Sequence, residues 1–151
     1  MSMSTQYREI PAQTRFSDFG NGGFLHFSKC LMYFEKARFQ ISQEAKLGAA
    51  LLESYPGKRV DFLVAKVDVS YLHPVPVSFD RGGQDLVTRT WLVEPFVSKL
   101  GFIQELVDPE TDTVLIHAEI DVALLLEGEG LIPSLNDACK KCLKDYCEGL
   151  I

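Results

Sequence analysis

One stretch of the sequence decides the fold: Arg15-Phe-Ser-Asp-Phe-Gly-Asn-Gly-Gly-Phe-Leu-His-Phe-Ser-Lys-Cys-Leu-Met-Tyr-Phe-Glu-Lys-Ala-Arg38. It follows an extended segment over residues 7–16 and contains a turn, Gly20-Asn-Gly-Gly23, where glycine adopts positive φ without steric cost. Apolar residues then recur at helical spacing, which predicts a helix over about residues 28–47 with Gly48 as a candidate end. Further apolar residues widen the stripe around the helix: Cys30, Met32, Tyr33 and Phe39. We therefore expect a helix that is enclosed on several sides.

The rest of the chain predicts strands joined by short turns. Apolar and polar residues alternate over residues 63–71 and again over 113–126, as in strands with one buried face. Further strands are predicted at residues 85–94 and 101–107, and short turns favour antiparallel pairing. The order predicts a single α+β domain over residues 1–151: a curved antiparallel sheet of about five strands, one long central helix and a C-terminal helix.

The C-terminal helix is predicted to follow Ser134, a candidate N-cap, and it carries Cys139, Cys142 and Cys147. A Cys-x-x-Cys pair can indicate zinc or a redox dithiol, but zinc requires four ligands and no histidine accompanies these cysteines. Helical periodicity places two of them on an apolar stripe, which favours a role in the core. We expect no metal and no cofactor.

Composition and charge exclude several classes of protein. The chain has 151 residues, of which 46% are hydrophobic and 24% charged, as in globular domains. Its net charge of -6 and the absence of a Lys/Arg stripe argue against a nucleic-acid partner. No apolar run approaches the ~20 residues of a membrane-spanning helix, and no basic-then-apolar leader opens the chain. We expect a cytoplasmic protein that binds neither nucleic acid nor membrane.

The start of the central helix is a candidate site for an anion or a carbonyl oxygen. The first turn of a helix leaves backbone N–H groups free at the positive end of the helix dipole. Such groups can hold an oxyanion that develops on a carbonyl, and a glycine turn lets the ligand approach the backbone closely. The alternative is that Gly22 and Gly23 only shape the connection.

The same stretch resembles a known family. The pattern aromatic-x-Asp-x-x-x-x-Gly at residues 16–23, followed by Tyr33-Phe-Glu-Lys-Ala-Arg38, is similar to hot-dog-fold acyl-CoA thioesterases of the 4-hydroxybenzoyl-CoA thioesterase type. Three later motifs fit the same order: Val67-Asp-Val-Ser-Tyr71, His73-Pro74 and Leu131-Ile-Pro133. The resemblance implies a hot-dog fold, a homodimer or homotetramer, and acyl-thioester sites at the dimer interface.

The sequence departs from the family pattern at the catalytic acid. Asp18 matches the first acid of the family's Asp-x-Asp, but the second acid, the usual nucleophile or general base, falls on Gly20. A position that is often His or Asn falls on Phe27. Gly23 and the N–H groups around Phe27 match the turn and helix start that polarise the thioester carbonyl. Asn21 is either a further donor to that carbonyl or an ordinary turn residue.

Three side chains are candidates to replace the missing acid. Glu35 lies on the helix, as do catalytic acids of other hot-dog thioesterases, and is either the general base or the partner of Arg38 in an i, i+3 ion pair. Asp18 activates water or caps the turn. His26 has a pKa suited to base catalysis but lies one position from the family's histidine, so it can also be structural. Related thioesterases of enediyne biosynthesis also lack the second acid and are thought to use an oxyanion hole and bound water.

We therefore expect hydrolysis of an acyl thioester, carried by coenzyme A or acyl carrier protein, at a backbone oxyanion hole. One alternative is a non-hydrolytic acyl-thioester binding protein, and another is a dehydratase or other hot-dog enzyme. An exposed edge of the sheet would be covered by pairing across a two-fold axis. Scattered basic residues are candidates for coenzyme A phosphates, and none is assigned: Lys58, Arg59, Arg81, Arg89 and Lys99.

Overall fold

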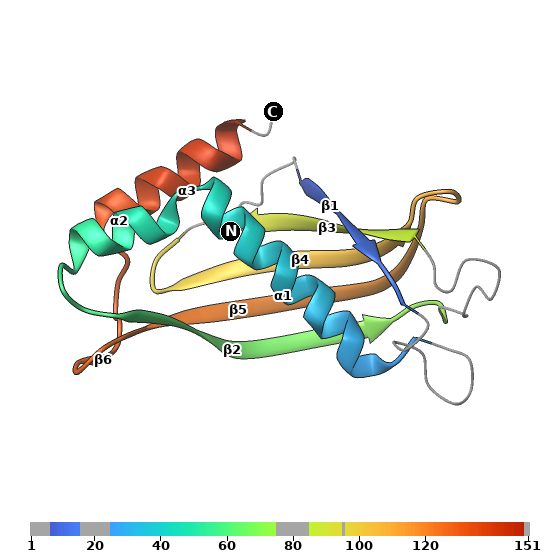
Figure 1. Ribbon diagram of the computed structural model, residues 1–151, viewed down its shortest axis with the longest axis horizontal. Helices are drawn as coiled ribbons and strands as arrows, with labels where there is room; N and C mark the ends of the chain where they lie inside the picture. Colours follow the sequence, from blue (N-terminus) through green and yellow to red (C-terminus); the bar gives the residue numbers. More distant parts are fainter. Residues whose placement is uncertain (1–6, 16–24, 75–84, 95, 150–151) are drawn as a thin grey trace.

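The strands form one antiparallel sheet in the order β1-β3-β4-β5-β2, with the short β6 paired to β5 (Figure 1). The structure is a computed structural model that describes residues 7–15, 25–74, 85–94 and 96–149. The strands are β1 (Arg8–Gln13), β2 (Val60–Tyr71), β3 (Asp85–Val93), β4 (Lys99–Asp108), β5 (Thr113–Leu126) and β6 (Gly130–Leu131). The helices are α1 (Phe27–Glu44), α2 (Leu47–Ser54) and α3 (Asp137–Gly149). The predicted α+β architecture is confirmed.

The core lies between α1 and the face of the sheet that α1 crosses (Figure 1). Phe34, Ala37 and Ile41 of α1 are buried, and so are Ile116 and Ile120 of β5. The alternation predicted for residues 113–126 is confirmed, because even-numbered positions from 116 to 124 are buried while the odd positions 117, 119 and 121 are more exposed. Burial of one face fixes which side chains of β5 meet the helix.

The central helix ends earlier than predicted. α1 stops at Glu44, and Lys46 adopts a left-handed conformation with φ of 59°, after which α2 begins at Leu47. The Lys46 N–H donates to the carbonyl of Gln43 at 3.1 Å, so local backbone bonding ends the helix without glycine. The prediction of Gly48 as the end was wrong, since this residue lies inside α2.

The N-cap predicted for the C-terminal helix was also wrong. The side chain of Asn136 accepts a hydrogen bond from the Cys139 N–H at 3.0 Å, and α3 begins at the next residue, Asp137. Ser134 lies two residues before this cap. Asparagine is as strong an N-cap as serine, and the position nearest the first turn decides which side chain is used.

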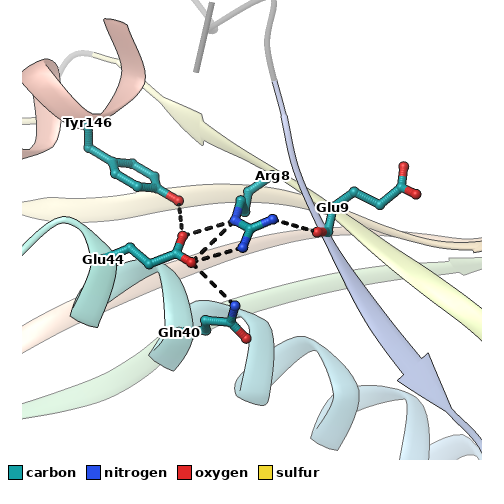
Figure 2. A network of polar contacts seen from close by, with 5 residues as sticks. All are labelled: Arg8, Glu9, Gln40, Glu44 and Tyr146. Carbon is teal, nitrogen blue, oxygen red and sulfur yellow. Dashed lines mark hydrogen bonds and ion pairs between the residues drawn. The ribbon is translucent and has the colours of Figure 1, made fainter. Parts of the chain in front are cut away.

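A polar network joins α3 and β1 to the end of α1 (Figure 2). The Arg8 guanidinium donates to both carboxylate oxygens of Glu44, with Nε at 2.9 Å and Nη2 at 3.0 Å. Tyr146 donates to the same carboxylate at 2.6 Å, and Gln40 donates at 3.3 Å. The Arg8 hydrogen bond is the main reason that the pKa of Glu44 falls to about 2. One carboxylate thus connects three elements.

The cysteines are core residues. All four are free thiols, and Cys30, Cys139 and Cys147 are buried in the hydrophobic core. Burial raises the pKa of Cys30 and of Cys147 to about 11, so both thiols stay protonated at neutral pH.

Among the described residues, no helix is both long enough and apolar enough to cross a bilayer.

β2 lies at the edge of the sheet and is exposed along most of its length. Its exposed apolar side chains include Leu63 and Val67, of which 51% and 43% is accessible. On the outer side of α1, Met32 and Phe39 are 56% and 53% accessible. The predicted enclosure of α1 on several sides is not complete within one chain, because the sheet covers one side of the helix and leaves an apolar strip exposed.

Candidate functional site

The residue at the N-cap of α1 does not cap the helix with its side chain. His26 is the N-cap, with an extended conformation at φ −70° and ψ 135°, and its side chain makes no capping hydrogen bond. Its ring Nδ1 lies 3.1 Å from the Ser28 hydroxyl instead. No acidic residue occupies the first turn of α1. The positive end of the helix dipole therefore meets no carboxylate from its own first turn.

A hollow of about 290 Å³ opens beside this helix start. It is lined by Leu25, Cys30, Tyr71, Leu72, His73, Pro74 and Ile116. Burial is the main reason that the pKa of the Tyr71 phenol is raised, so this group is a hydrogen-bond donor at neutral pH. The raised pKa of Cys30 argues against a thiolate nucleophile here.

A second cavity, of about 150 Å³, lies farther along α1. Glu35, Arg38 and Ser42 line one side of it, at helical positions that share a face. The opposite wall is apolar and comes from β2, β4 and β5: Phe62, Val64, Leu100, Phe102 and Val122. Apolar cavities of about this volume hold a group the size of benzene. The cavity combines an apolar wall with three polar side chains.

Arg38 is fixed in this cavity by a fully buried glutamine of β4. Its Nη1 donates to Oε1 of Gln104 at 2.9 Å. The amide Nε2 of Gln104 donates in turn to the Phe34 carbonyl and to the Thr90 hydroxyl, each at 3.0 Å. Gln104 and Thr90 are 0% and 1% exposed. The guanidinium is therefore held in place from the interior of the sheet.

The charge of Arg38 is not neutralised within the part of the chain that the structure describes. No ion pair there joins it to a carboxylate, so the i, i+3 pair with Glu35, which was the alternative to a catalytic role for Glu35, is not formed. Burial lowers the pKa of Arg38, and the nearby charge of Glu35 partly offsets this effect. Arginine nevertheless remains protonated, so the cavity offers a half-buried cation.

The predicted site residues are only partly brought together. Asp18, Asn21 and Gly23 lie outside the described residues, as does Gly20. His26 and Phe27 lie at the helix start, as predicted, and Phe27 is the first residue of α1.

Glu35 lies apart from these residues. It is eight residues beyond Phe27, or about 12 Å along the helix axis at 1.5 Å per residue. Its carboxylate faces the second cavity rather than the hollow at the helix start.

Sequence reasoning missed the contribution of Gln104. One signal was available, because Gln104 is a polar residue in the buried phase of β4, between Phe102 and Leu106. A polar side chain at such a position needs a partner in the interior. The identity of that partner depends on how α1 crosses the sheet, and the spacing along the chain does not specify this.

The sequence matches no family model and no curated protein sequence. Solved structures do match the fold. A probable thioesterase from Bartonella henselae has a TM-score of 0.70 and 18% identity, over 87% of this chain and 98% of that chain. A 1,4-dihydroxy-2-naphthoyl-CoA thioesterase from Synechocystis has a TM-score of 0.73 and 13% identity, over 92% and 96% of the two chains.

A third structure, a hypothetical protein from Staphylococcus aureus in complex with CoA, has a TM-score of 0.78 and 9% identity, over 100% of this chain and 90% of that chain. The narrower resemblance, to the 4-hydroxybenzoyl-CoA type, stays a prediction. At these identities the likeness is one of fold: the chain has the hot-dog fold that it shares with these structures.

Proposed function

We propose that this protein hydrolyses an acyl thioester of coenzyme A or of acyl carrier protein. The observation that carries the proposal is the start of α1, where the His26 side chain makes no capping hydrogen bond and a hollow of about 290 Å³ opens beside the helix. Two structures of the same fold are described as a probable thioesterase and as an acyl-CoA thioesterase. A helix start of this kind is suited to a carbonyl oxygen that gains negative charge.

The proposed reaction is direct attack by water. Backbone N–H groups near Gly23 and Phe27 bind the thioester carbonyl oxygen, and Asn21 is a further candidate donor. A water oxygen bonds to the carbonyl carbon while a general base takes its proton. The C–S bond then breaks, and the thiolate leaves and is protonated to the free thiol. Removal of one oxyanion-hole donor typically costs ~10²–10³ in rate, so an intact hole supports turnover without the family's usual acid.

Glu35 is the general base in this proposal, acting from a second copy of the chain. Within one copy it lies about 12 Å from Phe27 along the helix axis, whereas a base must reach its proton directly or through one water. A two-fold axis that pairs the exposed β2 edges sets the two α1 helices antiparallel on the same face of the joined sheet. That arrangement moves Glu35 of one copy toward the helix start of the other and covers Phe39, which lines the cavity on the β2 side.

The alternative is a protein that binds an acyl thioester without hydrolysing it. It is favoured by one observation, that Gly20 stands where the family places its second acid. Such a protein would retain the helix start and the apolar cavity. A thiol-release assay over a panel of acyl-CoA substrates separates the two functions, because a binding protein gives only the uncatalysed rate while still binding acyl-CoA.

The role of Glu35 is tested by Glu35→Gln, with Glu53→Gln on the exposed side of α2 as the matched control. We expect Glu35→Gln to lower kcat by at least about tenfold without changing the oligomeric state, since general-base help contributes ~10²–10⁴. Gly20→Asp should leave activity measurable. If Glu35→Gln is kinetically silent while His26→Ala or Asp18→Asn is not, the base is wrongly assigned.

A further inference from the structure

A groove of about 440 Å³ runs between β1 and the N-terminal half of α1, away from both cavities of the proposed site. Figure 1 shows these two elements beside each other. Ile10 and Ala12 form part of its floor on β1, and Met32 and Tyr33 contribute from α1. The volume is within the ~300–1,000 Å³ that small-molecule sites occupy.

Cations gather on this groove. Lys29 and Lys36 line it from α1, and Arg15 lines it beyond the end of β1. The two lysines are seven residues apart, so they lie on one face of the helix about 10 Å apart along its axis. Among the residues that the structure describes, no carboxylate lines the groove. In a chain of net charge -6, the cations that line the groove make a locally positive surface.

Unlike several other cations of the chain, the two lysines are not paired with a carboxylate in the described ranges. Lys58, Arg59 and Arg89 each form an ion pair with a carboxylate of this chain. Within the described ranges, neither Lys29 nor Lys36 forms an ion pair or a side-chain hydrogen bond. Their charges are therefore available to a ligand.

We infer that this groove binds the phosphates of coenzyme A, an inference that rests on the proposed function. Lys29 is two residues beyond Phe27, so one end of the groove adjoins the helix start where the thioester carbonyl would bind. The nucleotide of coenzyme A carries a diphosphate and a separate 3′-phosphate, which suits two lysines at separate points along one groove. Met32, which is 56% exposed, and Tyr33 offer apolar surface to the adenine ring.

The test is calorimetric titration of the full chain with three probes that differ in phosphate content: coenzyme A, 3′-dephospho-coenzyme A and pantetheine. The variant is Lys29→Gln/Lys36→Gln, and the control is Lys140→Gln/Lys144→Gln on α3, which makes the same change in net charge. We expect the wild type to bind the probes in the order of their phosphate content. The groove variant should bind coenzyme A at least about tenfold more weakly, since each hydrogen bond to a charged group contributes about one decade.

The remaining outcomes overturn the inference or separate it from hydrolysis. The groove assignment fails if the groove variant binds coenzyme A as tightly as the control variant does. It also fails if the affinity of the groove variant for pantetheine falls by the same factor as its affinity for coenzyme A, or if the wild type binds only an acyl carrier protein. If coenzyme A binding depends on the two lysines but no acyl thioester is cleaved, the groove stands and hydrolysis fails. If acyl-CoA is cleaved and the groove variant keeps the wild-type KM, hydrolysis stands and the groove fails.

Discussion

The buried amide of Gln104 is the most informative position to perturb, because it joins three groups on two elements. Gln104→Leu keeps the side-chain size but removes the hydrogen bonds to Arg38, Phe34 and Thr90. The bond to the charged guanidinium contributes about 1.5–3 kcal/mol, and each neutral bond contributes about 1 kcal/mol. Burial of additional apolar surface by leucine recovers about 1–2 kcal/mol. We expect a net loss of about 2–3 kcal/mol in the free energy of unfolding.

The loss is measured by urea denaturation, with circular dichroism as the probe of unfolding. Equal m-values for variant and wild type would indicate that both unfold in two states. Gln43→Leu on the exposed side of α1 is the matched control and should change stability by less than about 0.5 kcal/mol. Thr90→Val removes only one bond of the network. The double variant with Gln104→Leu should be less destabilised than the sum of the two single variants by about 1 kcal/mol, because the two residues share that bond.

Two results would refute this reasoning. A loss below about 0.5 kcal/mol for Gln104→Leu would mean that the network makes no net contribution to stability. Strict additivity with Thr90→Val would mean that the two side chains are not coupled, in which case Thr90 does not help to hold the Gln104 amide. A further readout is kinetic: Gln104→Leu should raise the KM of an active enzyme more than Gln43→Leu does, because Arg38 loses its fixed position in the cavity.

Three more predictions follow from the fold and its open edge. Glu44→Gln should lower stability by about 1 kcal/mol at pH 7, a modest loss because the ion pair with Arg8 is partly exposed to solvent. The native pKa of Glu44 is about 2, so this contribution is complete above the ordinary pKa near 4.5 and is lost as the pH falls toward 2. The stabilities of variant and wild type, measured by urea denaturation, should therefore converge in acid. Asn136→Ala should lower the thermal midpoint, with a loss of about 1 kcal/mol from the first turn of α3. Val67→Glu should convert the oligomer to monomer in light scattering, whereas Val97→Glu at an exposed site off β2 should not, and a wild type that is monomeric would contradict the proposed pairing.

The sequence predicts the strands well where one face is buried. Thr113–Leu126 was bounded correctly because its alternation is regular from Ile116 to Val122, and a slip of one residue there would expose apolar side chains. β2 was placed correctly, but its burial was not, since alternation indicates only that one face is apolar. It does not say whether this chain or another chain covers that face.

The helix ends and the site were less predictable because both depend on backbone and side-chain contacts that the local sequence does not specify. Lys46 adopts a left-handed conformation that its residue type does not favour, and its N–H donates to the Gln43 carbonyl, so residue propensity does not locate the end of α1. Glu35 was identified from its place on the helix, but the pair expected with Arg38 depends on where the guanidinium turns. Gln104 competes for that guanidinium from a strand 66 residues away, and local spacing carries no information about such a contact.

The distribution of charge around α1 connects these observations. Glu35 and Arg38 face the cavity on the β2 side, while Lys29 and Lys36 line the groove on the β1 side. A thioester bound at the helix start would therefore have cations for a phosphorylated carrier beside it, whereas the acid of its own copy is a further two turns away. In the proposed mechanism one copy binds the carrier, and the base comes from a second copy. We therefore propose that the exposed β2 edge serves catalysis as well as assembly in a chain that has glycine in place of the usual acid.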